Sequence, residues 1–122
     1  MNIKFSKEEL LKLLSEYYSN MFGKKICVKD DIAIKYIDGI AHINLKLFYE
    51  EDTQNMKIIK IINENDICNF LEHYADKHNL IFIYFKYLGT IRHTGYYVEE
   101  DSPIFEGICA NFEERKKKLI KK

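Results

Sequence analysis

Apolar side chains recur with a helical period near the start of the chain. The stripe is spaced by three and four residues, which is the pattern of a helix that lies on a core, and consists of Leu10, Leu13, Leu14, Tyr17 and Met21. Ser6 precedes it as an N-cap, and Glu9 three residues later completes a capping box. Gly23 is placed to end the helix in the left-handed conformation.

A second helix is predicted in the middle of the chain. Residues 63–66 offer several N-cap side chains, and Asn79 can end the helix in the left-handed region. The apolar stripe between them consists of Ile67, Phe70, Leu71, Tyr74, Ala75 and His78.

Alternating positions between the two helices predict strands. A first strand over 26–36 is interrupted at Asp30-Asp31, and Asp38-Gly39 is typical of a two-residue hairpin turn. Residues 41–49 then alternate between apolar and polar, as in a strand with one solvated face. A polar loop follows, and 56–62 reads as a third strand.

The segment after the second helix is almost entirely apolar. Residues 80–88 predict a strand with both faces buried, which indicates a central strand or one covered by a partner. A loop over 89–95, a short strand over 96–98 and a turn over 99–103 precede a final strand over 104–112. From Glu113 onward the chain is charged, and we expect it to be helical or frayed.

These elements predict an α+β fold in the order α-β-β-β-α-β-β-β. Because hairpins dominate, we expect a mostly antiparallel sheet of five to six strands, with the two main helices on one face and a short helix at the C-terminus. The length of 122 residues fits one domain over 1–122, with 115–122 as a basic, frayed tail.

The charge balance counts against a nucleic-acid-binding protein, and the cysteine content counts against a disulfide-bonded protein. The 19 basic and 19 acidic side chains give no net charge, and Arg92 and Arg115 are the only arginines. Both features count against a dedicated nucleic-acid binder, although scarce arginine beside abundant Lys, Ile and Asn is also typical of an AT-rich genome. The three cysteines show no pairing pattern and the N-terminal residues form no apolar leader, so we expect a cytoplasmic protein.

Chemical motifs give little support to an enzyme. His73 and His78 are five residues apart and therefore do not share a helical face as zinc ligands would. No nucleophile elbow or phosphate-binding glycine loop occurs, although a triad assembled in space would not be visible in the sequence. We expect no metal and no cofactor.

One segment, residues 86–97, has a composition that a connecting loop does not require. It combines two glycines with one of the two arginines, a histidine and several tyrosines. Such a segment could hold a phosphate or present aromatic anchors to a protein partner, and a simple solvated hairpin loop remains the plain alternative. The candidate binding residues are Lys86, Tyr87, Arg92, His93, Thr94, Tyr96 and Tyr97.

The chain has nine tyrosines and eight phenylalanines, and several of them occupy strand positions that two helices cannot cover. Exposed apolar patches of this kind usually mark contacts, which favours a non-enzymatic interaction module. We expect a protein partner or self-association as a homodimer, and no membrane. A nucleic-acid-binding protein that uses residues 86–97 and the basic tail, and a small-ligand-binding domain, remain alternatives. In size and composition alone the chain resembles small accessory or inhibitory proteins of low-GC bacteria, their phages and other mobile elements, a likeness that assigns no site residue.

Overall fold

A computed structural model describes residues 1–30, 35–37, 40–43, 45–52, 57–90 and 104–115 of the chain. It contains two α-helices, Lys7–Phe22 (α1) and Glu64–Lys77 (α2), and a short 3₁₀ turn, Glu50–Asp52 (η1). The strands are Asn2–Ser6 (β1), Ile26–Asp30 (β2), Lys35–Ile37 (β3), Ile40–His42 (β4), Leu45–Tyr49 (β5), Lys60–Ile62 (β6), Leu80–Thr90 (β7) and Ile104–Glu114 (β8).

Helix α1 begins and ends where the sequence predicts. The Ser6 hydroxyl oxygen accepts a hydrogen bond from the Glu9 backbone N–H at 3.2 Å and donates one to the Glu9 carboxylate at 3.2 Å. The carboxylate therefore contacts the hydroxyl of the cap residue, whereas in a complete capping box it accepts from the cap backbone. Gly23 ends the helix with φ 69°, and its N–H donates to the Ser19 carbonyl at 2.9 Å.

Helix α2 has the complete version of the same cap. The Asn63 side chain accepts from the Asp66 N–H and the Asp66 carboxylate accepts from the Asn63 N–H, both at 3.0 Å. Asn79, just after the helix, has φ 56°, so its predicted left-handed conformation is confirmed. Both helices are thus bounded by local side-chain chemistry.

Among the described residues all strand pairs are antiparallel, and they form two three-stranded sheets. One has the order β1-β8-β7 and the other β2-β5-β6, while β3 and β4 pair with each other. The α+β class, the antiparallel pairing and the two main helices are therefore confirmed. The single sheet we expected is divided in two, because β8 pairs with the N-terminal β1 and not with the strands between the helices.

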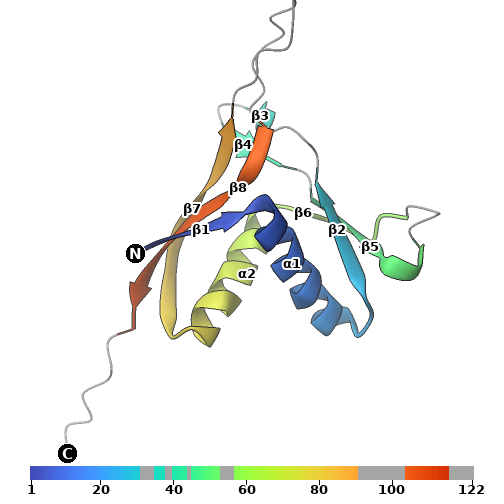
Figure 1. The fold of residues 1–122 in the computed structure, drawn as a ribbon, viewed down its shortest axis with the longest axis horizontal. Helices are drawn as coiled ribbons and strands as arrows, with labels where there is room; N and C mark the ends of the chain where they lie inside the picture. The colour runs from blue at the N-terminus through green and yellow to red at the C-terminus, as the bar shows by residue number, and fades with distance from the viewer. Residues whose placement is uncertain (31–34, 38–39, 44, 53–56, 91–103, 116–122) are drawn as a thin grey trace, which may run out of the picture.

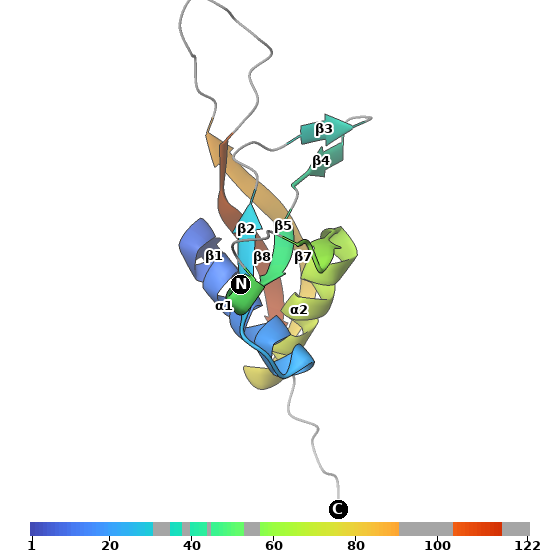
Figure 2. The ribbon, with the colours of Figure 1, turned by 90° about the vertical axis from the view of Figure 1, so that its right-hand side faces the viewer.

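The two helices lie side by side between the sheets, α2 next to β7 and α1 next to β2 (Figure 1). The view from the side shows the β2-β5 strands in front of β7 and β8, with the helices flanking them (Figure 2). One continuous core joins both sheets and both helices, and its largest fully buried side chains are Phe105, Phe112, Leu10, Leu14, Leu45, Leu47, Ile62, Ile67, Leu71 and Ile108.

Several boundaries differ from the sequence prediction, whereas the pairing of β3 with β4 agrees with the predicted hairpin. Strand β1, at residues 2–6, was not predicted. The expected strand over 41–49 is two strands, because β4 pairs with β3 while β5 pairs with β2 and β6. Ile37 lies opposite Ile40, as a two-residue connection at 38–39 requires. Residues 113 and 114 belong to β8, where we expected a helix or a frayed end.

The close approach of β1 to β8 depends on Gly107. This residue has φ 140°, a conformation that residues with a Cβ rarely adopt, and a Cβ there would collide with the Phe5 carbonyl oxygen. Ser6 lies opposite Gly107 at the last pair of the β1–β8 ladder, immediately before α1 begins. Glycine at 107 therefore lets the chain pass directly from β1 into α1.

Strand β7 is at the edge of its sheet, so the expectation of a central strand is wrong, while the alternative, a strand covered by a partner, stays a prediction. Its inward side chains Phe82, Phe85 and Tyr87 pack against the core. Ile81 and Tyr84 on the other side are 44% and 56% exposed. The continuous apolar run arises because an apolar inner face alternates with an apolar outer face.

Candidate interaction surface

Most of the predicted binding segment lies outside the described residues. Arg92, His93, Thr94, Tyr96 and Tyr97 fall in 91–103, so the predictions for them, and for a short strand over 96–98, stay predictions. Lys86 and Tyr87 are described, and they occupy opposite faces of β7. Lys86 is exposed, whereas the Tyr87 ring is partly buried against the core.

Tyr87 links β7 to the start of α2. Its hydroxyl donates a hydrogen bond to Glu64 Oε1 at 3.2 Å, and its ring meets those of Phe85 and Phe105 edge-on, at centroid distances of 5.3 and 6.1 Å. Burial, and secondarily the Glu64 carboxylate, raise the pKa of the Tyr87 hydroxyl above its ordinary value, because both disfavour the phenolate. These contacts make Tyr87 a structural residue of the inner face.

A one-residue β-bulge in β7 changes which side chains face outward. Phe82 lies opposite Phe112 and Tyr84 opposite Asn111, so Ile83 is an extra residue without a partner in β8. A bulge of this kind bends the strand and redirects side chains. The two consecutive residues Ile83 and Tyr84 are therefore both exposed, at 45% and 56%. Phe82 and Phe85 on either side of them pack inward.

Ile81, Ile83 and Tyr84 form an apolar surface, here called the outer patch, on the side of the β1-β8-β7 sheet that faces away from the helices. Asn111 lies beside Tyr84, and its amide donates to the Asn2 side-chain oxygen at 2.7 Å. The polar pair of Asn111 and Asn2 therefore lies next to the outer patch, on β8 and β1. Three large apolar side chains close together and half exposed are typical of a contact surface.

Charged side chains lie at both ends of the outer patch. Toward the C-terminal end of β7, Lys86 and Lys4 lie on either side of Cys109, and both lysines are exposed. Glu113 lies opposite Ile81 at the other end, and it is exposed as well. The two exposed lysines thus lie at one end of the outer patch and Glu113 at the other, while the exposed Glu106 lies at the irregularity of β8 beyond the lysines.

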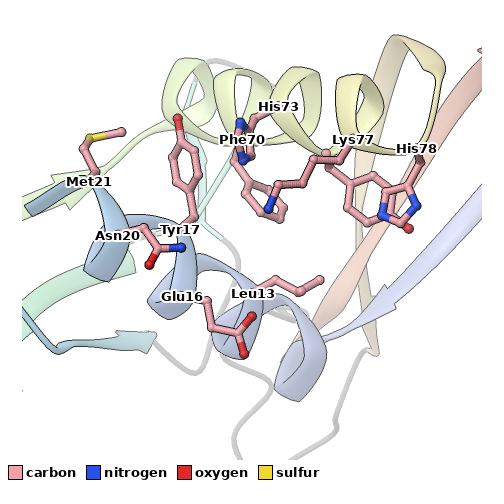
Figure 3. Close-up of a pocket in the computed structure, with 10 residues that line it drawn as sticks. Leu13, Glu16, Tyr17, Asn20, Met21, Phe70, His73, Lys77 and His78 are labelled. Atoms are coloured by element: carbon pink, nitrogen blue, oxygen red, sulfur yellow. The ribbon is translucent and has the colours of Figure 1, made fainter. Parts of the chain in front are cut away.

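A cleft of about 590 Å³ separates the C-terminal halves of α1 and α2. Tyr17 points from α1 toward α2, where Phe70 and His73 lie with ring centroids at 5.6 and 5.1 Å (Figure 3). The lining is mixed aromatic and charged, and it consists of Leu13, Glu16, Tyr17, Asn20, Met21, Phe70, His73, Tyr74, Lys77 and His78. Its size is within the range of small-molecule sites.

His73 and His78 both lie in this cleft, although their sequence spacing gave no reason to group them. Each ring contacts a tyrosine ring in a tilted arrangement, His73 with Tyr17 at 5.1 Å and His78 with Tyr74 at 4.2 Å between ring centroids. Among the described residues, no group of three histidine, cysteine or acidic side chains is arranged to hold a metal ion. The described helices include none with the length and apolar character needed to cross a membrane.

Comparison with models of known families, with curated proteins and with solved structures finds no match for this chain.

We predict that Tyr87→Phe lowers the free energy of unfolding at neutral pH by about 1 kcal/mol, since it removes one partly buried hydrogen bond. The raised pKa means that the folded state holds the phenolic proton more tightly than the unfolded state. Stability from this group is therefore complete below pH 10, the ordinary pKa of tyrosine, and is lost as the pH rises above it. The variant should lose stability less steeply above pH 10.

Urea unfolding followed by circular dichroism between pH 7 and 11 measures both effects. Tyr84→Phe, at an exposed tyrosine of the same strand, is the control and should keep the wild-type stability at neutral pH. An unchanged unfolding free energy for Tyr87→Phe at pH 7, or an equally steep alkaline loss, would contradict the structural role of Tyr87.

Proposed function

We propose that this chain is a non-enzymatic protein-interaction module, an accessory or inhibitory protein that acts by binding through its outer patch. The observation that carries the proposal is the exposure of Ile81, Ile83 and Tyr84 side by side on one strand. Leaving such side chains in water forgoes roughly 25 cal/mol for each Å² of apolar surface, and a partner that covers them recovers this free energy.

The make-up of the surface supports a protein partner. Tyrosine is enriched at the centres of protein interfaces, where removal of one well-packed side chain costs more than about 1 kcal/mol of binding. Tyr84 lies between the apolar Ile81 and Ile83 and the polar Asn111, so an apolar centre adjoins a polar border. This is the usual arrangement of a protein contact surface.

The rigidity of the strand also favours recognition. β7 pairs with β8 along nearly its whole length, and its inner side chains pack against the core that α2 covers. A surface held in this way loses little conformational freedom when a partner binds, so less of the contact energy is spent on ordering.

We predict that a photo-crosslinking residue, p-benzoylphenylalanine, placed at Tyr84 yields a discrete protein adduct in the cells that make this protein. The same residue at Lys12, which is exposed on α1, should yield none. Denaturing electrophoresis and mass spectrometry give the mass of the adduct. No adduct at Tyr84, or the same adduct from both positions, would contradict the proposed contact surface.

The cleft between α1 and α2 supports a second candidate, the binding of a small molecule with an aromatic or apolar body. Tyr17 and Tyr74 supply rings on which such a body could stack, and Glu16 and Lys77 supply opposite charges at the border.

A thermal-shift screen of nucleotides and metabolites tests this candidate, because a ligand at 100 times its Kd adds about 2.7 kcal/mol to native-state stability. We expect a hit to raise Tm by several degrees and to lose that effect in His73→Ala, but to keep it in Glu72→Ala, on an exposed residue outside the cleft lining. A screen without hits, or a shift equal in both variants, would remove the candidate.

A further inference from the structure

We propose that the partner of the outer patch is a second copy of this chain, packed face to face about a two-fold axis that runs across the strands near Tyr84. This inference rests on the proposed function and adds the identity of the partner. It follows from the order in which apolar and charged residues succeed one another along the outer face of the β1-β8-β7 sheet.

The pairing register divides this face into three successive rows. The first contains Ile81 and Glu113, and the second contains Tyr84, Asn111 and Asn2. The third contains Lys86, Cys109 and Lys4. Along the strands the face therefore passes from an acidic row, through an uncharged row with the exposed tyrosine, to a basic row.

A two-fold axis through the uncharged row makes this face complementary to itself. In an isologous contact, when a residue of the first copy meets a different residue of the second copy, the reciprocal contact forms as well. The first row of one copy then faces the third row of the other, so that Glu113 approaches Lys86 and Lys4 of the second copy, and the reciprocal contact forms at the other end. Tyr84 meets its own counterpart near the axis.

The three charged side chains are available for these contacts. Lys4, Lys86 and Glu113 are all exposed, and within the described part of the chain none of the three takes part in an ion pair. Opposite charges that meet across an interface select the partner and fix its orientation. A partner of uniform charge would instead be repelled at one end of the face.

The bulge explains why the contact uses the face of the sheet and not the edge of β7. Pairing of two β7 edges would need a regular ladder of backbone N–H and carbonyl groups, and a bulge interrupts such a ladder while Lys86 adds a charge to it. The same bulge places Ile83 and Tyr84 together on the outer face. It therefore disfavours edge pairing and enlarges the face.

Charge reversal tests this geometry. In K86E the introduced carboxylate would face Glu113 of the other copy at both symmetric contacts, and in E113K the introduced ammonium group would face Lys86. We expect each variant alone to dimerise at least about tenfold more weakly than the wild type at low salt. An equimolar mixture of the two should recover most of the wild-type affinity, because both contacts between positions 86 and 113 again join opposite charges, and only the approach of Lys4 to the introduced ammonium group stays unfavourable.

Sedimentation velocity on the full chain, over a hundredfold range of concentration at low ionic strength, measures the dimer constants. K12E and E72K, which reverse exposed charges on α1 and α2, are the matched controls and should keep the wild-type constant. Circular dichroism confirms that each variant is folded. A variant that does not fold is replaced by the neutral K86Q or E113Q, for which a smaller loss and a partial recovery on mixing are expected, because only one of the two contacts of the mixed dimer then joins opposite charges.

The outcomes separate this inference from the proposed function. A wild-type chain that stays monomeric over the whole range, or single variants that do not recover on mixing, would overturn the two-fold dimer. A crosslinked adduct from Tyr84 with the mass of a different protein would also overturn it, while leaving the outer patch as a contact surface. An adduct with twice the mass of the chain supports both proposals.

Discussion

Strand β8 lies in the middle of its sheet, and its pairing with β1 on one side and with β7 on the other brings the two ends of the described chain onto one core. Ile108, Ala110 and Phe112 of β8 are fully buried, so the strand tolerates no change of register. Between Phe82 and Tyr84, β7 contains one residue more than the facing part of β8. The bulge at Ile83 takes up that residue, and the inner face stays apolar on both sides of it.

Local chemistry explains which parts of the fold could be predicted. The helices are bounded by Ser6, Gly23, Asn63 and Asn79, each of which acts on neighbours within a few residues, and both helices were predicted correctly. β1 was missed because its five residues carry only a short alternation and its partner lies more than 100 residues further along the chain. The division into two sheets likewise depends on long-range pairing, which periodicity does not report.

The candidate surface shows the same limit. Lys86 lies on the exposed face of β7, and its role in binding stays a prediction, whereas Tyr87 belongs to the inner face, where its hydroxyl meets Glu64. The run at 80–88 was read as buried on both faces, since an apolar outer face gives the same sequence pattern as a covered one. Phe82 and Phe85 are three residues apart, so in a regular strand they would point to opposite faces. Both can point inward only if an extra residue lies between them.

Deletion of Ile83 tests the central claim, that a one-residue bulge reconciles a buried inner face with an apolar outer face. Removing one residue from a regular strand turns every following side chain to the other face, whereas removing the bulged residue should restore regular pairing. Urea unfolding should show a cooperative transition within about 2 kcal/mol of the wild type. Deletion of Lys86, which would turn Tyr87 outward, should cost at least about 2 kcal/mol more. Equal losses for the two deletions would contradict the bulge and the surface built on it.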